Sequence, residues 1–300
     1  MFKAAKLAEM RRSNSNGWES LCSPNVKSFA APEHFMKSFF SSVSCLLGVA
    51  VCVSLGGVSA SVKAADAVGQ VKPDIGWQKF LAREDLVWNT LPKSWNGGAF
   101  IGNGLLGAMI YSDGTNFLQW DVGRSDVTDR GDRIAIGRFA LQPQGVAGKG
   151  VMRLDLWNAE AHGSYQTAAG KTTWRSFSHA KDLFTVIELN EPAGARPAKI
   201  VFQHEPAVPA RAAYHHEAIP ADERNPDATF GETDGVNWCL QAFKAGGGYV
   251  VAWAEKTVSP GHRLLFFTVD YVPKGTPTTD QAVAEIQANL RAEFDDLVAS

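Results

Sequence analysis

The sequence predicts an all-β protein, built as a large antiparallel β-sandwich that is followed by one helix. Short runs rich in Val, Ile, Phe, Trp and Thr alternate between apolar and polar residues, and Gly, Pro and Asp separate them at regular intervals. No long helical pattern lies between the runs, which is typical of strands that pair with their neighbours. The runs are Gly137–Gln142, Val151–Trp157, Ala161–Tyr165, Thr172–His179, Leu183–Leu189, Ala198–His204, Val236–Phe243, Tyr249–Glu255 and Leu264–Tyr271.

The most distinctive stretch precedes these runs. Trp95–Tyr111 holds five glycines and two asparagines beside an apolar run. Glycine permits a positive φ or the close approach of another backbone, so the stretch predicts a tight turn that leads into a strand at Leu105–Tyr111. Asp113–Asn116 then has the composition of a hairpin turn, and Phe117–Val122 is its returning strand.

The segment IGNGLLGAMIYSDGTNFLQWD, which begins at Ile101, resembles the opening of the N-terminal domain of family 95-like glycoside hydrolases, a group that includes bacterial α-L-fucosidases. The shared order is Gly-Asn-Gly, then Leu-Gly-Ala-Met, then a hairpin, and the likeness covers roughly residues 85–130. That family continues with an Asn-Glu and a Leu-Trp-Ser-Gly pattern, whereas this chain has Gln119–Val127 at that place. The resemblance is therefore to a divergent subfamily.

The resemblance implies a galactose-mutarotase-like supersandwich, joined through a C-terminal linker helix to an (α/α)6 barrel that carries the catalytic groups. It also implies an inverting hydrolase that acts on α-L-fucosyl or related glycans without a metal or other cofactor. The barrel, an intramolecular partner, would then lie beyond Ser300, and the sandwich and linker helix would hold no catalytic residue.

Only the end of the chain changes to a helical period. Thr278 and Gln281 predict a Thr-x-x-Gln capping box at the start of an amphipathic helix within residues 276–300. The apolar residues at helical spacing are Ala282, Ile286, Leu290, Phe294 and Leu297. Such a face needs a partner. We expect a linker to a further domain and, as the alternative, a helix that folds back on the sheet.

The N-terminal part predicts export. Residues 36–64 have a short basic start, an apolar middle and small residues that suit cleavage, as a secretory signal peptide does, with a signal anchor as the alternative. Residues 1–35 are polar and would be a disordered leader or precede the true start at Met36. We therefore expect a secreted or periplasmic protein whose sandwich domain spans residues 65–275.

The positions of the cysteines and the net charge further restrict the class of protein. Cys22, Cys45 and Cys52 fall in the part expected to be removed, although a lipid-attachment site at one of the last two is a further alternative. The remaining Cys239 is expected to be a small buried hydrophobe. A formal net charge of -2 with scattered basic residues argues against a nucleic-acid partner. Beyond the signal no apolar run has membrane-spanning length, so no membrane partner is expected after its removal.

Residues 205–235 interrupt the strand pattern with four prolines and predict a long surface loop. The histidines are dispersed through the chain, so we expect no metal site. A site built from His204 with Glu205 and His215 or His216 is the alternative.

The candidate substrate-binding residues lie in and after the glycine-rich stretch. An acidic cluster with interleaved arginines follows the hairpin, where it either binds sugar hydroxyls through charge-assisted hydrogen bonds or forms a self-paired β-connection. The cluster consists of Asp121, Asp126, Asp129 and Asp132 with Arg124, Arg130 and Arg133. We predict sugar contacts at Trp95, Asn96, Asp121, Arg124 and Asp126, with a core position for Trp95 as the alternative.

Three functions are compatible with these features. The first is a non-catalytic sandwich domain of a secreted glycoside hydrolase, whose partner is an oligosaccharide or glycan substrate. The second is a free-standing carbohydrate-binding module. The third is a small mutarotase-like enzyme that uses a histidine and a carboxylate as acid and base.

Overall fold

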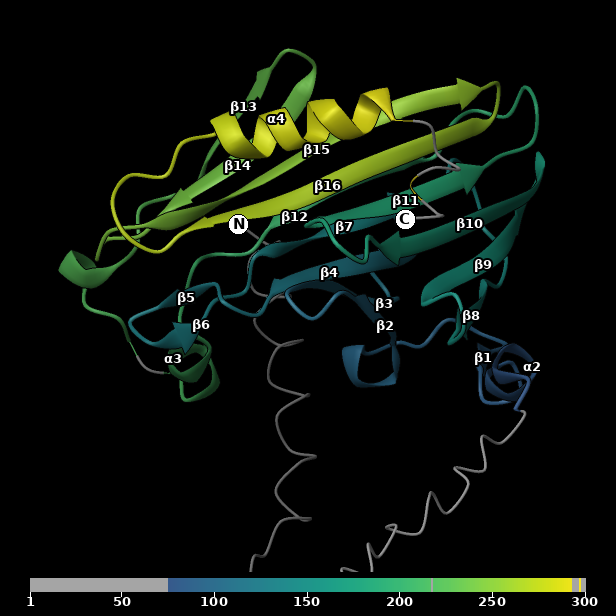
Figure 1. Cartoon of the computed structure of the whole chain (residues 1–300), viewed down its shortest axis with the longest axis horizontal. Helices are drawn as coiled ribbons and strands as arrows, with labels where there is room; N and C mark the ends of the chain where they lie inside the picture. The colour runs from purple at the N-terminus through teal and green to yellow at the C-terminus, as the bar shows by residue number, and fades with distance from the viewer. Residues whose placement is uncertain (1–74, 217, 293–296, 298–300) are drawn as a thin grey trace, which may run out of the picture. The chain divides into compact units, whose positions relative to one another are not determined.

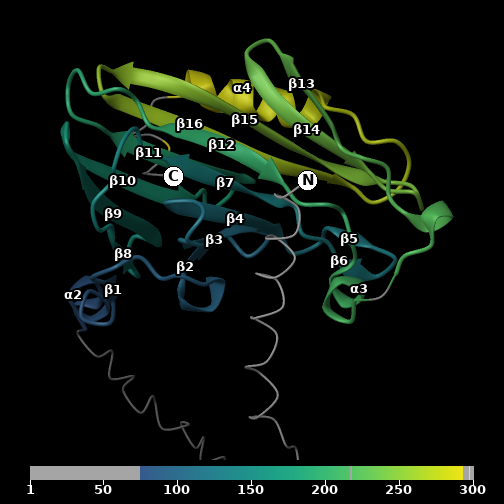
Figure 2. The ribbon, with the colours of Figure 1, turned by 180° about the vertical axis from the view of Figure 1, so that it is seen from behind.

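The computed structural model describes residues 75–216, 218–292 and 297, all of which belong to a compact unit that begins at Val71. The predicted leader and signal peptide lie outside the described residues and stay predictions. The two main antiparallel sheets contain nine and five strands and pack face to face, which confirms the all-β sandwich (Figure 1). Figure 2 shows the same two layers from behind.

The strand order is β1-β8-β9-β10-β11-β16-β15-β14-β13 in the nine-stranded sheet and β12-β7-β4-β3-β2 in the five-stranded sheet, and β5 and β6 form a separate two-stranded ribbon. The bounds are β1 Leu86–Trp88, β2 Ala99–Gly102, β3 Leu106–Tyr111, β4 Leu118–Arg124, β5 Thr128–Asp129, β6 Asp132–Arg133, β7 Gly137–Gln142, β8 Val151–Asp155, β9 Glu160–Thr167, β10 Gly170–Ser178, β11 Phe184–Asn190, β12 Lys199–His204, β13 Thr229–Thr233, β14 Val236–Ala242, β15 Gly248–Ser259 and β16 His262–Val272. Each alternating run of the sequence corresponds to one of these strands.

Two predictions need correction. The glycine-rich stretch is not wholly a turn, because Ala99 and Ile101 alternate into the core and form strand β2 beside β3. Residues 205–235 are not wholly a loop, because they contain the two short helices α3 (Ala210–Tyr214) and η2 (Ala221–Glu223) and strand β13. Strand β13 has mostly exposed side chains and no apolar alternation, since its order comes from pairing with β14.

The core between the sheets is aromatic. Phe139 of the five-stranded sheet stacks on Phe267 of the nine-stranded sheet with ring centroids 4.5 Å apart, and Trp120 meets Trp174 edge to face at 5.7 Å. Cys239 is fully buried, as predicted, and burial raises the pKa of its thiol to about 12. The thiolate is therefore disfavoured at neutral pH, as expected for a structural cysteine.

Helix α4 (Asp280–Arg291) lies on the outer face of the nine-stranded sheet (Figures 1 and 2). Ala282, Val283 and Ile286 are buried in a second core cluster with side chains of β11, β15 and β16. The helix thus folds back on the sheet, which covers its apolar face. The predicted capping box is wrong, because the N-cap is Thr279 and makes no side-chain capping bond. Of the predicted apolar positions, Phe294 lies outside the described residues.

Glu285 on α4 is half-buried, and its Oε2 lies 3.2 Å from the hydroxyl of Thr268. Burial raises the pKa of this carboxyl above its ordinary value. The carboxylates of Asp182 and Asp270 act in the same direction, whereas the Thr268 hydroxyl and the charge of Arg124 act against it. The folded protein therefore holds the Glu285 proton more tightly than the unfolded chain does.

We expect Glu285→Gln to be more stable than the wild type near neutral pH. Because the folded pKa is the higher one, the wild type has the stabilising contribution of protonated Glu285 below the ordinary glutamate pKa and loses it as the pH rises through the folded pKa. The gain is on the order of 0.5 kcal/mol once solvent screening is allowed for. Thermal unfolding of both proteins between about pH 4 and about pH 8 measures it. A difference that does not change with pH contradicts the interpretation.

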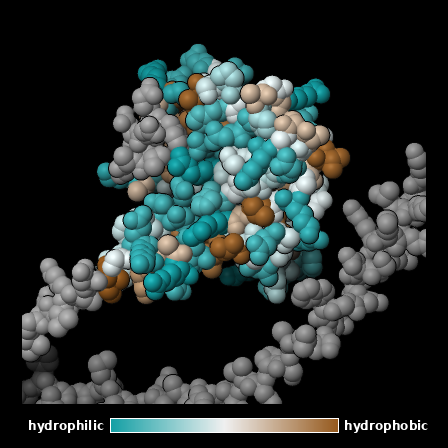
Figure 3. Space-filling view, turned by 90° about the vertical axis from the view of Figure 1, so that its right-hand side faces the viewer, coloured by the Kyte–Doolittle hydropathy of each residue, from teal (hydrophilic) through white to brown (hydrophobic). Residues whose placement is uncertain are grey.

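Within the described residues, no helix has the length and apolar character needed to span a membrane. The side of the sandwich drawn in Figure 3 is mainly hydrophilic, with small, separate apolar patches. On that view the described side chains form no broad apolar area.

Candidate functional site

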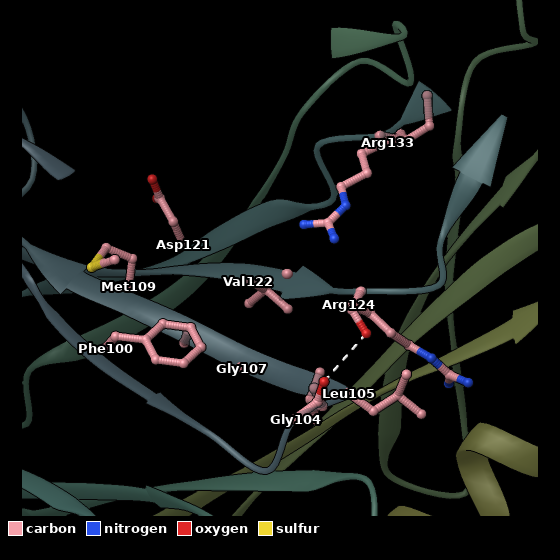
Figure 4. A pocket seen from close by; sticks show the side chains of 14 residues that line it. Phe100, Gly104, Leu105, Gly107, Met109, Asp121, Val122, Arg124 and Arg133 are labelled. Carbon is pink, nitrogen blue, oxygen red and sulfur yellow. Dashed lines mark hydrogen bonds between the residues drawn. The ribbon is translucent and has the colours of Figure 1, made fainter. Parts of the chain in front are cut away.

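Three glycines stand side by side on the outer face of the five-stranded sheet. Gly102 of β2 is opposite Gly107 of β3, and Gly107 is opposite Gly123 of β4. Gly107 and Gly123 of this row line a hollow of about 310 Å³, whereas Gly102 lies outside its lining (Figure 4). The glycine-rich stretch thus supplies half of the residues that line this depression on the surface.

Phe100 lies over one end of this floor. A Cβ atom placed on Gly107 would come within 2.9 Å of the Phe100 ring, and one on Gly102 within 3.0 Å. A Cβ atom on Gly123 would meet nothing within 4 Å. Phe100 is 58% exposed, so one face of the hollow presents an aromatic ring and the other end of its floor is open.

A row that begins with Met109 and continues with three polar side chains crosses the same face. Met109, Asp121, Arg138 and Gln203 follow one another across strands β3, β4, β7 and β12. Asp121 accepts hydrogen bonds from the hydroxyl of Tyr111 at 2.5 Å and from the amide of Gln119 at 3.0 Å. These bonds fix the carboxylate at the rim of the hollow in one orientation.

The electrostatics of the rim are dominated by Arg138. Its guanidinium contacts three carboxylates: Asp121 at 3.3 Å, Asp113 at 3.8 Å and Glu205. Burial raises the pKa of Asp121, and the bonds and charges of its neighbours partly offset this. Burial, together with the nearby carboxylate, raises the pKa of Tyr111 to about 12, so its hydroxyl stays a donor. This end of the hollow therefore carries more negative than positive charge.

Of the five predicted site residues, Asp121 and Arg124 line the hollow. Arg124 lines the hollow with its backbone, whereas its guanidinium points away from it in Figure 4. That guanidinium donates to the carbonyl of Val269 in the other sheet and pairs with Asp126 at 2.8 Å. The Arg124–Asp126 pair therefore helps to join the two sheets.

Trp95 and Asn96 lie on the short helix η1 (Trp95–Gly97), outside the hollow. Trp95 is 65% exposed, which excludes the alternative core position. The Asn96 side chain accepts a hydrogen bond from the hydroxyl of Ser94 at 2.6 Å. A Cβ atom placed on Gly98, directly after the helix, would lie 3.1 Å from the Met109 sulfur, so η1 is next to the site without lining it.

The rest of the acidic cluster forms structural connections. Asp129 accepts from the amide of Asn225, Asp132 accepts from the backbone of Arg211, and Arg130 pairs with Glu223. These contacts hold the β5–β6 ribbon to residues 205–225, so they join two segments instead of pairing within one.

Asn103 is the second member of the Gly-Asn-Gly motif and links the two sheets. Its amide donates to the carbonyls of His179 and Asp182 in the β10–β11 turn at 2.9 and 3.0 Å. Its carbonyl accepts from the backbone of Leu105 and Leu106. The motif therefore has a structural asparagine between glycines that shape the surface.

The alternative histidine site is not assembled. His204 is 3.1 Å from the hydroxyl of Tyr249, whereas the neighbouring Glu205 turns to Arg138. In the part of the chain that the structure describes, no group of three or more His, Cys, Asp or Glu residues is placed to hold a metal ion.

Sequence reasoning missed Phe100, Gly107, Gly123 and Arg138. The alternation of Phe100 and Gly102 with buried residues was a usable signal once β2 is recognised as a strand. The alignment of glycines from three strands has no signal in the linear sequence, because it depends on register.

No protein-family model matches the sequence, and a search of curated proteins gives no match. Among solved structures, the chain is similar to a protein described as a kojibiose phosphorylase from the human microbiome, with 10% identity and a TM-score of 0.42. The match covers 72% of this chain and 34% of that one, so this chain spans about a third of that structure's length. A similarity of this size carries no argument about function.

The fold and the hollow define a class: an antiparallel β-sandwich domain with a mainly apolar, aromatic-edged depression on one sheet, which has charged side chains at its rim. The particular family stays a prediction, since it depends on the resemblance of the glycine-rich segment to family 95-like hydrolases.

Proposed function

We propose that the hollow on the five-stranded sheet binds a carbohydrate. The observation that carries this proposal is the open backbone at Gly123, which lies beside Gly107 under the exposed Phe100 ring and near the fixed carboxylate of Asp121. Sugar rings have an apolar C–H face that packs on aromatic rings, and hydroxyls that pair with carboxylate and amide groups. Phe100 offers the first kind of contact and the Asp121 rim the second.

The same proposal extends to the whole protein. We infer a non-catalytic sandwich domain of an exported glycoside hydrolase that acts on fucosylated or related glycans, with its acid and base in a helical barrel outside this chain. The sequence resemblance and the signal-peptide pattern support this assignment. A free-standing carbohydrate-binding module is the second candidate, favoured by one observation: the apolar face of α4 is already covered by the sheet.

Phe100→Ala tests the proposed contact with sugar. We expect roughly tenfold weaker binding of any glycan that the wild type binds, because the variant loses the stacking surface. A glycan array finds the ligand, and calorimetric titration measures the affinity. Phe230→Ala is the matched control, since Phe230 on β13 is also 58% exposed but lies on the other sheet. Equal loss of affinity in both variants, or in neither, overturns the assignment of the hollow.

A further inference from the structure

We infer that the ligand of the hollow is an anionic sugar, one that carries a carboxylate or a sulfate group. This inference rests on the proposed function and adds the substrate class. It comes from Arg133 on β6, which lines the hollow from the side opposite Phe100. In Figure 4 its guanidinium reaches over β4 toward the floor near Val122.

Arg133 differs from the other arginines near the hollow in having no protein partner. Arg124 is held by Asp126 and Val269, and Arg138 is surrounded by three carboxylates. Among the described residues, the Arg133 side chain makes no ion pair or hydrogen bond, and the adjacent Asp132 carboxylate accepts from two backbone amides instead. Its donors are therefore available to a ligand.

The hollow is thus polarised along β4. Asp121 and the carboxylates around Arg138 leave surplus negative charge at one end, whereas Arg133 adds an uncompensated positive charge at the other. A neutral sugar would leave the guanidinium unused. A sugar with one anionic group would place that group at Arg133 and its hydroxyls at Asp121, because guanidinium matches the planar oxygens of carboxylate and sulfate.

The test compares charged sugars with neutral forms of the same shape. The probes are uronic-acid oligosaccharides and their methyl esters, and sulfated oligosaccharides and their desulfated forms, titrated against the whole chain by calorimetry. We expect the charged form to bind about tenfold more tightly than its neutral form. The preference should weaken as salt is added, since the pair is open to solvent. The natural ligand carries the anionic group, carboxylate or sulfate, for which the ratio of charged-form to neutral-form affinity is larger.

Variants assign the preference to one side chain. Arg133→Gln should remove the discrimination, Arg133→Lys should keep part of it, and Arg196→Gln, a loss of charge at an exposed site between β11 and β12, should leave it unchanged. Asp121→Asn should weaken charged and neutral forms by the same factor. Equal binding of charged and neutral sugars overturns the inference but leaves the proposed function intact. No binding of any probe overturns both.

Discussion

Gly123→Val should abolish glycan binding and leave the fold intact. The valine side chain would project into the open end of the hollow, where a Cβ atom meets no protein atom within 4 Å. Valine suits a strand better than glycine, so the melting temperature should stay the same or rise slightly. A ligand that fits the wild-type hollow would meet the added methyl groups, and we expect at least roughly tenfold weaker binding. Calorimetric titration and thermal unfolding of the same samples measure both effects.

Two comparisons make this result specific. Gly107→Val should lower the melting temperature, because a Cβ atom there would lie 2.8 Å from the carbonyl of Ile101 and 2.9 Å from the Phe100 ring. Gly76→Val, at the N-cap of helix α2 (Trp77–Leu81), also faces open space but lies outside the hollow, so it should leave glycan binding unchanged. If Gly123→Val binds glycans as the wild type does, the hollow is not the binding site.

Asn103→Ala should destabilise the fold more than the replacement of a polar side chain usually does. The Asn103 side chain makes four hydrogen bonds that join the glycine-rich turn to the β10–β11 turn of the other sheet. Removing it leaves two carbonyls and two amides of partly buried backbone without this partner. We expect a decrease of roughly 2–3 kcal/mol in the free energy of unfolding, measured by denaturant titration.

A second substitution at Asn103 and a control at another asparagine test this prediction further. Asn103→Asp keeps the acceptor for Leu105 and Leu106 but sets a carboxylate against the carbonyls of His179 and Asp182, so it should also destabilise. Asn158→Ala should have a small effect, since the Asn158 side-chain amide donates only one hydrogen bond, an exposed one to the Asp155 side chain three residues away. A change of less than about 0.5 kcal/mol in Asn103→Ala would show that the sheets are held together without this clamp.

The two predictions separate two roles of the residues around the hollow. Asn103 acts through the fold, whereas Gly123 acts through the open surface that it leaves. Phe100 has both a structural and a binding role, because its exposed ring borders the hollow and also covers Gly107, which stabilises the β2–β3 pair. A loss of binding in Phe100→Ala is thus best judged beside Gly123→Val, which does not disturb that packing.

Local patterns were enough to predict most of the strands. Val236–Phe243 and Leu264–Tyr271 alternate strongly because one face of each meets a core, and alternation is visible in the chain itself. Strand β13 escaped prediction for the opposite reason, since Gly231 interrupts it, Phe230 is exposed and its order comes from pairing with β14. Strand β2 does alternate, but it is only four residues long and lies within the glycine-rich stretch.

Site residues were harder to predict than strands. Asp121 was found from the acidic cluster, but Arg124 and Asp126 from the same cluster turn to the opposite sheet. An arginine beside an aspartate in the sequence looks the same whether it faces solvent or a buried carbonyl. The direction of the side chain depends on what packs above the strand, which composition does not contain.

The fold class, most strand positions and the hairpin turns follow from the amino-acid sequence, because alternation and turn-forming residues act over a few neighbouring positions. Three features emerged only with the folded chain: the alignment of Gly102, Gly107 and Gly123, the placing of Phe100 and Arg133 on opposite sides of the hollow, and the cover that the sheet gives to α4. Each depends on the register of strands and the packing of layers, which are set by contacts between residues distant in the chain.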